Sequence, residues 1–178
     1  MQRQTGHTLL EAILVVTIIG IIAAVIVPTA SPSRLYQLEH AATELATAIR
    51  YARNEAIRTT NPHGIVIDET NNQFKVFSLN TANNPPSPVY DVYHPVNKKT
   101  YEVDLSTLAN AKVDAIALTS QYQGSCNRTE YIVFNKYGAA FCIEPWLIPY
   151  VKSNIRLSLD KHIININLMG ISGTVTIQ

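Results

Sequence analysis

A long apolar run near the N-terminus constrains this chain more than any other feature of its sequence. No charged residue occurs between Glu11 and Arg34, and residues 12–27 read AILVVTIIGIIAAVIV with Thr17 as the only polar side chain. A soluble helix of this length would show a polar face, and this one shows none. Since roughly 20 helical residues cross the hydrocarbon core of a bilayer, the stretch from Leu9 to Ala30 is long enough to insert in a membrane.

Two interpretations of this segment compete, a secretory signal peptide and a retained membrane helix. A signal peptide has a basic start, a short apolar region and a small-residue cleavage site after it. Here the apolar run is longer than usual, it leads directly into a helical pattern, and Glu11 stands at its start. An ionisable group at that depth is costly, which indicates a function and a partner for the Glu11 carboxylate.

The stretch Gly6-His7-Thr8-Leu9-Leu10-Glu11, with the apolar run and Pro28 after it, resembles a class III prepilin leader. Type IV pilins and type II secretion pseudopilins share this leader. The resemblance implies that a prepilin peptidase cuts after Gly6, that the new N-terminal residue His7 is N-methylated, and that Glu11 supports filament assembly. The family usually has Phe where this chain has His7. Pairing between Glu11 and the α-amino group of a neighbouring subunit would relieve two desolvation costs at once.

A second helix is expected over residues 31–61. Pro28 and the run Ser31-Pro32-Ser33 predict a break or kink, because proline cannot donate the helical hydrogen bond. From there apolar residues recur at alternating spacings of three and four, which predicts one face packed under a globular head. Asn61-Pro62 ends the pattern. The stripe consists of Leu35, Leu38, Ala42, Leu45, Ile49, Ala52 and Ala56.

Within that helix, Leu45-x-x-Ala48-Ile49-x-x-Ala52-Arg53-x-Glu55-Ala56-Ile57 resembles the signature of the GspH/FimT branch of the pilin-like proteins. Members of the branch are minor pseudopilins of type II secretion and minor pilins of type IV pilus systems. Ala52, Arg53, Glu55 and Ala56 are the residues that carry the resemblance. Since Arg53 and Glu55 are two positions apart, they do not face each other on a helix, and each is expected to pair with the head or with solvent.

Beyond Pro62 the pattern changes from helical to alternating, which predicts a β-rich head over residues 62–178. Residues 63–79 read as a β-hairpin, 81–88 as a loop and 130–134 as a strand, and the Phe134-x-x-x-Gly138 element resembles the same branch. Alternating residues near 155–159, 164–168 and 175–177 predict strands with one buried face. The predicted fold class is therefore α+β and type IV pilin-like. A long N-terminal helix, membrane-spanning in its first half, would pack against an antiparallel sheet of two parts.

The two cysteines, Cys126 and Cys142, fall in the head, which the resemblance places in the oxidising periplasm. A disulfide between them would close a loop whose stabilisation is roughly 3 kcal/mol in the chain-entropy model. Two buried free thiols are the alternative. The oxidising compartment is the one argument that favours the disulfide.

The sequence shows no motif for catalysis, cofactor binding or metal binding. The five histidines lack metal-ligand spacing, and the chain has no nucleophile elbow, phosphate loop or dinucleotide fingerprint. We therefore expect no enzymatic activity, no cofactor and no metal site. The chain has 14 Lys and Arg against 13 Asp and Glu, so its net charge of +1 gives no general case for nucleic acid as a partner.

The sequence thus predicts a structural subunit made of a leader (1–6), a transmembrane and filament-core helix (7–30), an amphipathic helix (31–61) and the head. The predicted location is the bacterial inner membrane, single pass, with a cytoplasmic N-terminus and a periplasmic head, and then the filament. Predicted partners are other pseudopilins or pilins, the prepilin peptidase, the inner-membrane assembly platform and membrane lipid. Supporting protein secretion in a type II pseudopilus is the leading interpretation.

Two alternatives remain open. The first is a FimT-like minor pilin for pilus biogenesis or DNA uptake. DNA-uptake members carry a C-terminal Gly-Arg-x-Arg element, whereas this chain reads Gly173-Thr174-Val175-Thr176, and phosphate contacts need clustered cations. The second is an adhesive or substrate-binding tip subunit that would use loops such as residues 81–99.

Overall fold

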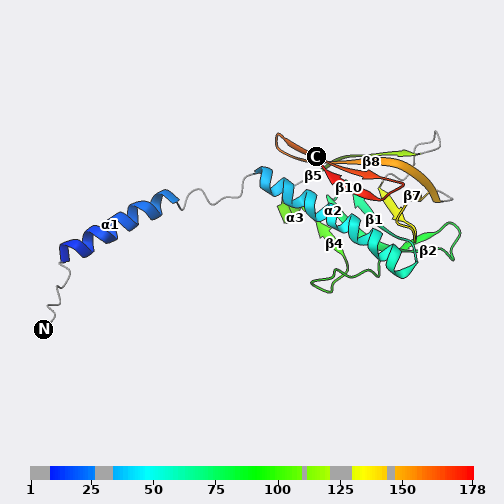
Figure 1. Ribbon diagram of the computed structural model, residues 1–178, viewed down its shortest axis with the longest axis horizontal. Coiled ribbons are helices and arrows are strands. Elements are labelled where there is room, and N and C mark those ends of the chain that lie inside the picture. The colour runs from blue at the N-terminus through cyan, green and yellow to red at the C-terminus, as the bar shows by residue number, and fades with distance from the viewer. Residues whose placement is uncertain (1–8, 27–33, 110–111, 121–129, 144–146) are drawn as a thin grey trace. The chain divides into compact units, whose positions relative to one another are not determined.

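The computed structural model describes residues 9–26, 34–109, 112–120, 130–143 and 147–178, and the chain divides into two compact units, Met1–Ser33 and Arg34–Gln178. The first unit holds helix α1, Leu9–Ile26 (Figure 1). Its side chains through Ile22 are exposed, and the hydroxyl of Thr17 donates to the carbonyl of Leu14 at 2.8 Å. Among the described residues, no helix is both long and apolar enough to cross a membrane. The predicted membrane segment, residues 7–30, extends outside the described range and stays a prediction.

The second unit begins with α2, Arg34–Thr59, whose apolar face is built largely of alanine. Small side chains allow the helix backbone to approach a sheet closely. The predicted stripe is buried from Leu38 onward, whereas Leu35 in the first turn is 42% exposed. The helix ends where the sequence indicates, since Thr60 has a left-handed φ of 58° and Pro62 follows. The buried residues are Leu38, Ala41, Ala42, Leu45, Ala46, Ala48, Ile49, Ala52 and Ala56.

Within the described ranges, most of the rest of the unit is an antiparallel sheet of ten strands with the order β10-β9-β8-β7-β6-β1-β2-β3, in which β4 also pairs with β2 and β5 with β8. The strands are β1 (His63–Asp68), β2 (Gln73–Asn80), β3 (Ser87–Val89), β4 (Glu102–Asp104), β5 (Lys112–Ser120), β6 (Tyr131–Phe134), β7 (Ala140–Ile143), β8 (Leu147–Leu159), β9 (His162–Met169) and β10 (Thr174–Ile177).

The sheet has two parts, and the long strand β8 joins them. Its first residues pair with β7, in the register Phe141↔Pro149, while residues 152–159 pair with β9. Helix α2 contacts strands of both parts and lies along the sheet in Figure 1. The predicted α+β class, with a long helix on an antiparallel sheet, is therefore confirmed.

The main core lies between α2 and the sheet. It contains the alternating residues that the sequence indicated in β8 and β9, and apolar residues of β1 and β2 from the predicted hairpin. Tyr101 and Leu105 are also buried in it. A smaller cluster of Phe77, Leu79, Val133 and Ile143 lies apart from it.

Two local features differ from the sequence-based expectation. The predicted loop over residues 81–88 ends early, because Ser87 and Pro88 form β3 on an edge of the sheet, where proline leaves no ladder bond unmade. A short helix, α3 (Leu105–Ala109), was not expected. It begins at Asp104, whose Oδ1 accepts the backbone N–H of Ser106 at 2.8 Å, as an N-cap does.

Candidate assembly site and the Arg53 junction

Glu11 lies in the first turn of α1. A carboxylate is favoured there, because the unpaired N–H groups of a helix N-terminus carry partial positive charge. The large apolar side chains of α1 as far as Ile22 surround the helix on all sides and are about half exposed or more. Gly6, His7 and Pro28 lie outside the described residues. Cleavage, methylation, the kink and the assembly role of Glu11 therefore stay predictions.

Five of the six apolar residues of the predicted signature in α2, Leu45, Ala48, Ile49, Ala52 and Ala56, are completely buried, and the sixth, Ile57, is 41% exposed. Ala52 and Ala56 lie one turn apart on the face that packs against the sheet. The buried residues of the motif therefore form the contact between helix and sheet, so packing as well as family membership accounts for them.

Arg53 of the same motif reaches across to the turn between β6 and β7. Its Nε donates to the carbonyl oxygen of Gly138 at 3.2 Å, across a separation of 85 residues. The turn is rigid because the Asn135 side chain accepts the N–H groups of Tyr137 at 2.9 Å and Ala139 at 3.1 Å. Gly138 has φ = 78°, a conformation that favours glycine. Arg53 thus fixes the Phe134-x-x-x-Gly138 element on α2.

A third segment, the turn between β9 and β10, completes this cluster. Gly173 has φ = 64°, and a Cβ atom placed on it would collide with the carbonyl oxygen of Gly138 and with Nε and Cδ of Arg53. We call this contact of Arg53, Gly138 and Gly173 the Arg53 junction. Sequence reasoning related Arg53 and Gly138 to one family but predicted no contact between them. It assigned no role to Gly173, although a glycine in a Gly-x-x-Gly turn was a visible signal.

A neighbouring arginine secures the last strand in a similar way. Nη2 of Arg50 donates to the carbonyl oxygen of Val175 in β10 at 3.0 Å. The pairing of Gln178 with Asn165 orients the N–H and C=O of Val175 toward the free edge of the sheet. Arg50 therefore satisfies an edge carbonyl, which is one way in which proteins protect an exposed strand.

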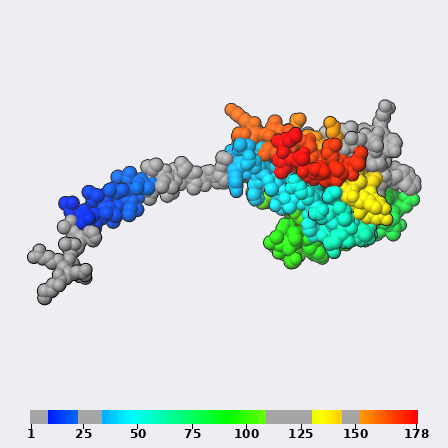
Figure 2. Space-filling model, viewed as in Figure 1, coloured from blue at the N-terminus to red at the C-terminus, as the bar shows by residue number. Residues whose placement is uncertain are grey.

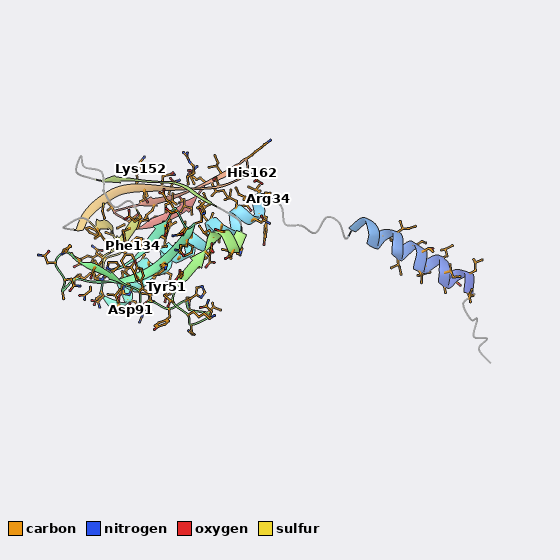
Figure 3. The ribbon with its side chains drawn as sticks, turned by 180° about the vertical axis from the view of Figure 1, so that it is seen from behind. Arg34, Tyr51, Asp91, Phe134, Lys152 and His162 are labelled. Atoms are coloured by element: carbon orange, nitrogen blue, oxygen red, sulfur yellow. The ribbon has the colours of Figure 1, made fainter. Side chains whose placement is uncertain are left out.

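Glu55, the other charged residue of the motif, pairs within α2 and not with the sheet. Its Oε2 lies 2.6 Å from Nη2 of Arg58. The pair borders an open groove of about 390 Å³ beside Tyr51, His63 and Asp91. Figure 3 labels Tyr51 and Asp91 on this part of the head.

Polar groups of that groove already have partners within the protein. The hydroxyl of Ser78 donates to Asp91 at 2.6 Å, and Nδ1 of His63 lies 2.9 Å from the carbonyl oxygen of Asn61. The hydroxyl of Tyr51 donates to the carbonyl of Tyr93 at 3.3 Å, and burial raises the pKa of the Tyr51 phenol. Within the described ranges, no group of three His, Cys, Asp or Glu residues could hold a metal ion. The groove is thus a structural surface of paired groups.

Only one of the two cysteines of the predicted disulfide lies within the described residues. Cys142 is disulfide-bonded and completely buried in β7. Its predicted partner, Cys126, lies outside the described residues, so the pairing stays a prediction.

This fold, a long helix packed on a two-part antiparallel sheet, defines a type IV pilin-like protein. Residues 41–141 match the model of the family described as type II transport protein GspH, and residues 1–27 match the prokaryotic N-terminal methylation motif. Because the first match covers more than half of the chain, the chain belongs to the GspH family. Its class is that of the minor pseudopilins and minor pilins of type II secretion systems and type IV pili, which are structural filament subunits.

Solved structures show the same fold. Two structures of the minor pseudopilin EpsH from the type II secretion system of Vibrio cholerae give TM-scores of 0.52 and 0.51. They cover 79% and 80% of this chain and 92% and 96% of theirs, at 11% and 12% identity. Over 53 residues the chain is 49% identical to the pilin-like protein PilA1 of Thermus thermophilus. That match covers 30% of this chain and only 33% of the relative.

Proposed function

We propose that this chain is a minor subunit of a type II secretion pseudopilus that supports protein export across the outer membrane. The observation that carries the proposal is α1, a helix with apolar side chains on every side. Burying one large apolar side chain contributes about 1.5–3 kcal/mol, so α1 is stabilised strongly by lipid or by other apolar helices. The residues concerned are Leu9, Leu10, Ile13, Leu14, Val15, Val16, Ile18, Ile19, Ile21 and Ile22.

The N-terminal chemistry follows from the same proposal. A prepilin peptidase would remove residues 1–6 and expose the α-amino group of His7, which would then be methylated. In the bilayer the carboxylate of Glu11 has a high desolvation cost. Pairing it with the N-terminus of a neighbouring subunit offsets that cost, so the pair favours assembly over free diffusion in the membrane.

The proposed arrangement has the N-terminus in the cytoplasm, α1 in the inner membrane and the head, from Arg34 onward, in the periplasm. Arg3 and the α-amino group, on the N-terminal side of the apolar run, support this orientation. The inner-membrane assembly platform and the peptidase are the proposed partners besides other pilin-like subunits. The proposed role is structural and not enzymatic.

A type IV pilus is the second candidate, and the 49% identity to a pilin-like protein favours it. DNA uptake receives less support within that candidate. The segment 173–176 lacks arginine, and Gly173 packs tightly on Arg53 and is not free to present a cationic element. Salt-sensitive DNA binding by the head in a mobility-shift assay would reverse this ranking.

Substitution of Glu11 tests the proposed role. Glu11→Val should leave membrane insertion intact and abolish recovery of the chain in sheared filaments. Thr17→Val is the matched control, since it also removes a polar group from α1 and should assemble normally. Filaments that contain the Glu11→Val chain at the wild-type level would contradict the assembly role.

Processing is tested separately by mass spectrometry of the membrane-bound chain. Wild type should begin at His7 and carry one additional methyl group, whereas Gly6→Val should retain residues 1–6. A Gly6→Val chain that begins at His7 would refute the cleavage site.

A further inference from the structure

The outer face of the C-terminal strands, on the side of the sheet away from the main core, is an ordered polar surface. Along β8, Ile155 and Leu157 are buried in the main core, so their neighbours Asn154 and Arg156 point to the other face. The strand register places nine outward residues in three rows, which we call the polar grid. The rows are Lys152-Met169-Thr174, Asn154-Asn167-Thr176 and Arg156-Asn165-Gln178. Figure 2 shows the C-terminal strands, in orange and red, at the surface of the head.

The amide side chains of the grid hold one another in place. Nδ2 of Asn154 donates to Oδ1 of Asn167 at 2.8 Å, and Nδ2 of Asn167 donates to Oε1 of Gln178 at 3.1 Å. These two bonds cross from β8 over β9 to the residue after β10. Each amide nitrogen has two N–H groups, so a second one is left for a ligand. Because the side chains are already ordered, binding costs them little conformational entropy.

The composition of the grid is polar, with a positive charge. Its nine residues comprise four amides, two threonines, two cations and one methionine, and none of them is acidic. Lys152 is exposed and has no carboxylate partner among the described residues; Figure 3 labels it on this part of the head. Met169, which is 50% exposed, is the one apolar side chain of the grid. Protein–protein interfaces have an apolar centre, so the grid is poorly suited to a protein partner.

The same features indicate which kind of ligand fits. An amide presents a donor and an acceptor side by side, which matches the hydroxyl groups of a sugar. Nucleic acid is bound by clustered cations and by aromatic side chains that stack on bases, and the grid has two cations and no aromatic residue. Lys152 and Arg156 are four residues apart along β8, which is about 13 Å at roughly 3.3 Å per residue. A surface of this extent suits an extended, hydroxylated chain that carries anionic groups.

We propose that the polar grid binds a carboxylated glycan, the peptidoglycan strand of the cell wall, with the amides on sugar hydroxyls and Lys152 at a carboxylate. This inference rests on the proposed function, because a filament that grows through the periplasm passes the glycan network. A minor subunit brings a single grid, so the contact is weak and reversible. It positions the head in the wall, whereas the apolar helices supply the cohesion of the filament.

Cosedimentation of the full-length chain with purified peptidoglycan sacculi tests the proposal. The chain is kept in a detergent without a sugar headgroup, so that the detergent does not compete. Chitin is the comparison polymer, because it is an insoluble glycan without carboxylates. We expect about fivefold more chain in the pellet with sacculi than with chitin, since only sacculi offer Lys152 a charge-assisted hydrogen bond. High salt should remove this difference, because it screens an exposed ionic contact.

A carboxylate introduced on the grid gives the decisive comparison. Thr176→Glu should lower the fraction bound to sacculi about tenfold, because the new charge repels the ligand and lies in the middle row. Thr107→Glu is the matched control, since it makes the same change at an exposed position of α3 and should bind like wild type. Lys152→Gln should lower binding to sacculi to the level of chitin. Thermal midpoints of the three chains verify that they are folded.

Three results would overturn the proposal. The first is a folded Thr176→Glu chain that binds sacculi as well as Thr107→Glu does. The second is equal binding of the wild-type chain to sacculi and to chitin, which would exclude the carboxylate contact. The third is release of the chain from sacculi by double-stranded DNA, which would assign the grid to nucleic acid.

Filament recovery is measured for the same variants, so that the two hypotheses fail separately. Wild-type chain that is present in filaments but absent from the sacculus pellet would refute the glycan contact and leave the proposed function intact. Absence of the wild-type chain from every filament fraction would instead refute the proposed function.

Discussion

Gly173→Ala probes the Arg53 junction most directly. The substitution places a methyl group where φ is 64° and where the Gly138 carbonyl and the Arg53 side chain already occupy the space. A left-handed conformation costs an ordinary residue about 1–2 kcal/mol. Overpacking adds about 1–3 kcal/mol, because the carbonyl belongs to the backbone of a hydrogen-bonded turn. The free energy of unfolding should therefore fall by roughly 2–5 kcal/mol.

The assay is thermal and urea unfolding of the head, Arg34–Gln178, which contains every described residue of the main core. At about 2–4 °C per kcal/mol for a domain of this size, the Tm should fall by roughly 4–20 °C. Ile171→Ala is the matched control, since Ile171 is 71% exposed in the same turn and the substitution adds no atom beside the junction. We expect its Tm to lie within about 2 °C of wild type.

A double substitution separates the two sources of the cost. Arg53→Ala alone removes a hydrogen bond from a charged donor, which contributes up to about 1.5–3 kcal/mol and less when the donor is partly exposed. In the Arg53→Ala background, Gly173→Ala should cost about 1 kcal/mol less than in wild type, because one of its two colliding partners is gone. A Gly173→Ala head as stable as wild type would refute the packing argument, and strict additivity would show that Arg53 does not contribute to it.

Three further outcomes are expected of the same head. Thr60→Gly should raise the free energy of unfolding by about 0.5–1 kcal/mol, because a β-branched residue is strained at φ = 58°, and urea midpoints decide this. Gly64→Val should destabilise the head by more than about 2 kcal/mol, since a Cβ there meets the Phe77 ring at 2.7 Å; an unchanged midpoint would contradict the close approach. Burial raises the pKa of Tyr101 to about 12 from its ordinary value of 10.0. The unfolded chain ionises this phenol first, so stability should fall as pH rises from about 10 to 12, and Tyr101→Phe should weaken that dependence.

Local sequence patterns were sufficient to predict several helices and strands of this protein. The spacing of Leu38, Leu45, Ile49 and Ala56 predicted the buried face of α2, because a helix places residues three and four apart on one side whatever it packs against. Alternation predicted β8 and β9 for the corresponding reason with a period of two. Leu35, in the first turn, was predicted to be buried and is not, because periodicity does not show where along the helix the sheet begins to cover it.

Short elements were less accessible to sequence reasoning. The helix α3 has one turn and too few residues for a periodic pattern, so only the capping Asp104 indicated it. Strand β3 contains Pro88, which argues against a strand until its place on an edge of the sheet is known. In both cases tertiary contacts stabilise a conformation that the local sequence specifies weakly.

The sequence by itself determined the apolar N-terminal segment with its single carboxylate, Glu11, and the family to which the chain belongs, because these depend on composition and on neighbouring residues. Only the tertiary structure showed that Arg53, Gly138 and Gly173 meet, and that the turn before β7 and the turn before β10 both lie against α2. Contacts between segments 35 to 120 residues apart depend on strand order and register, and no local pattern encodes them.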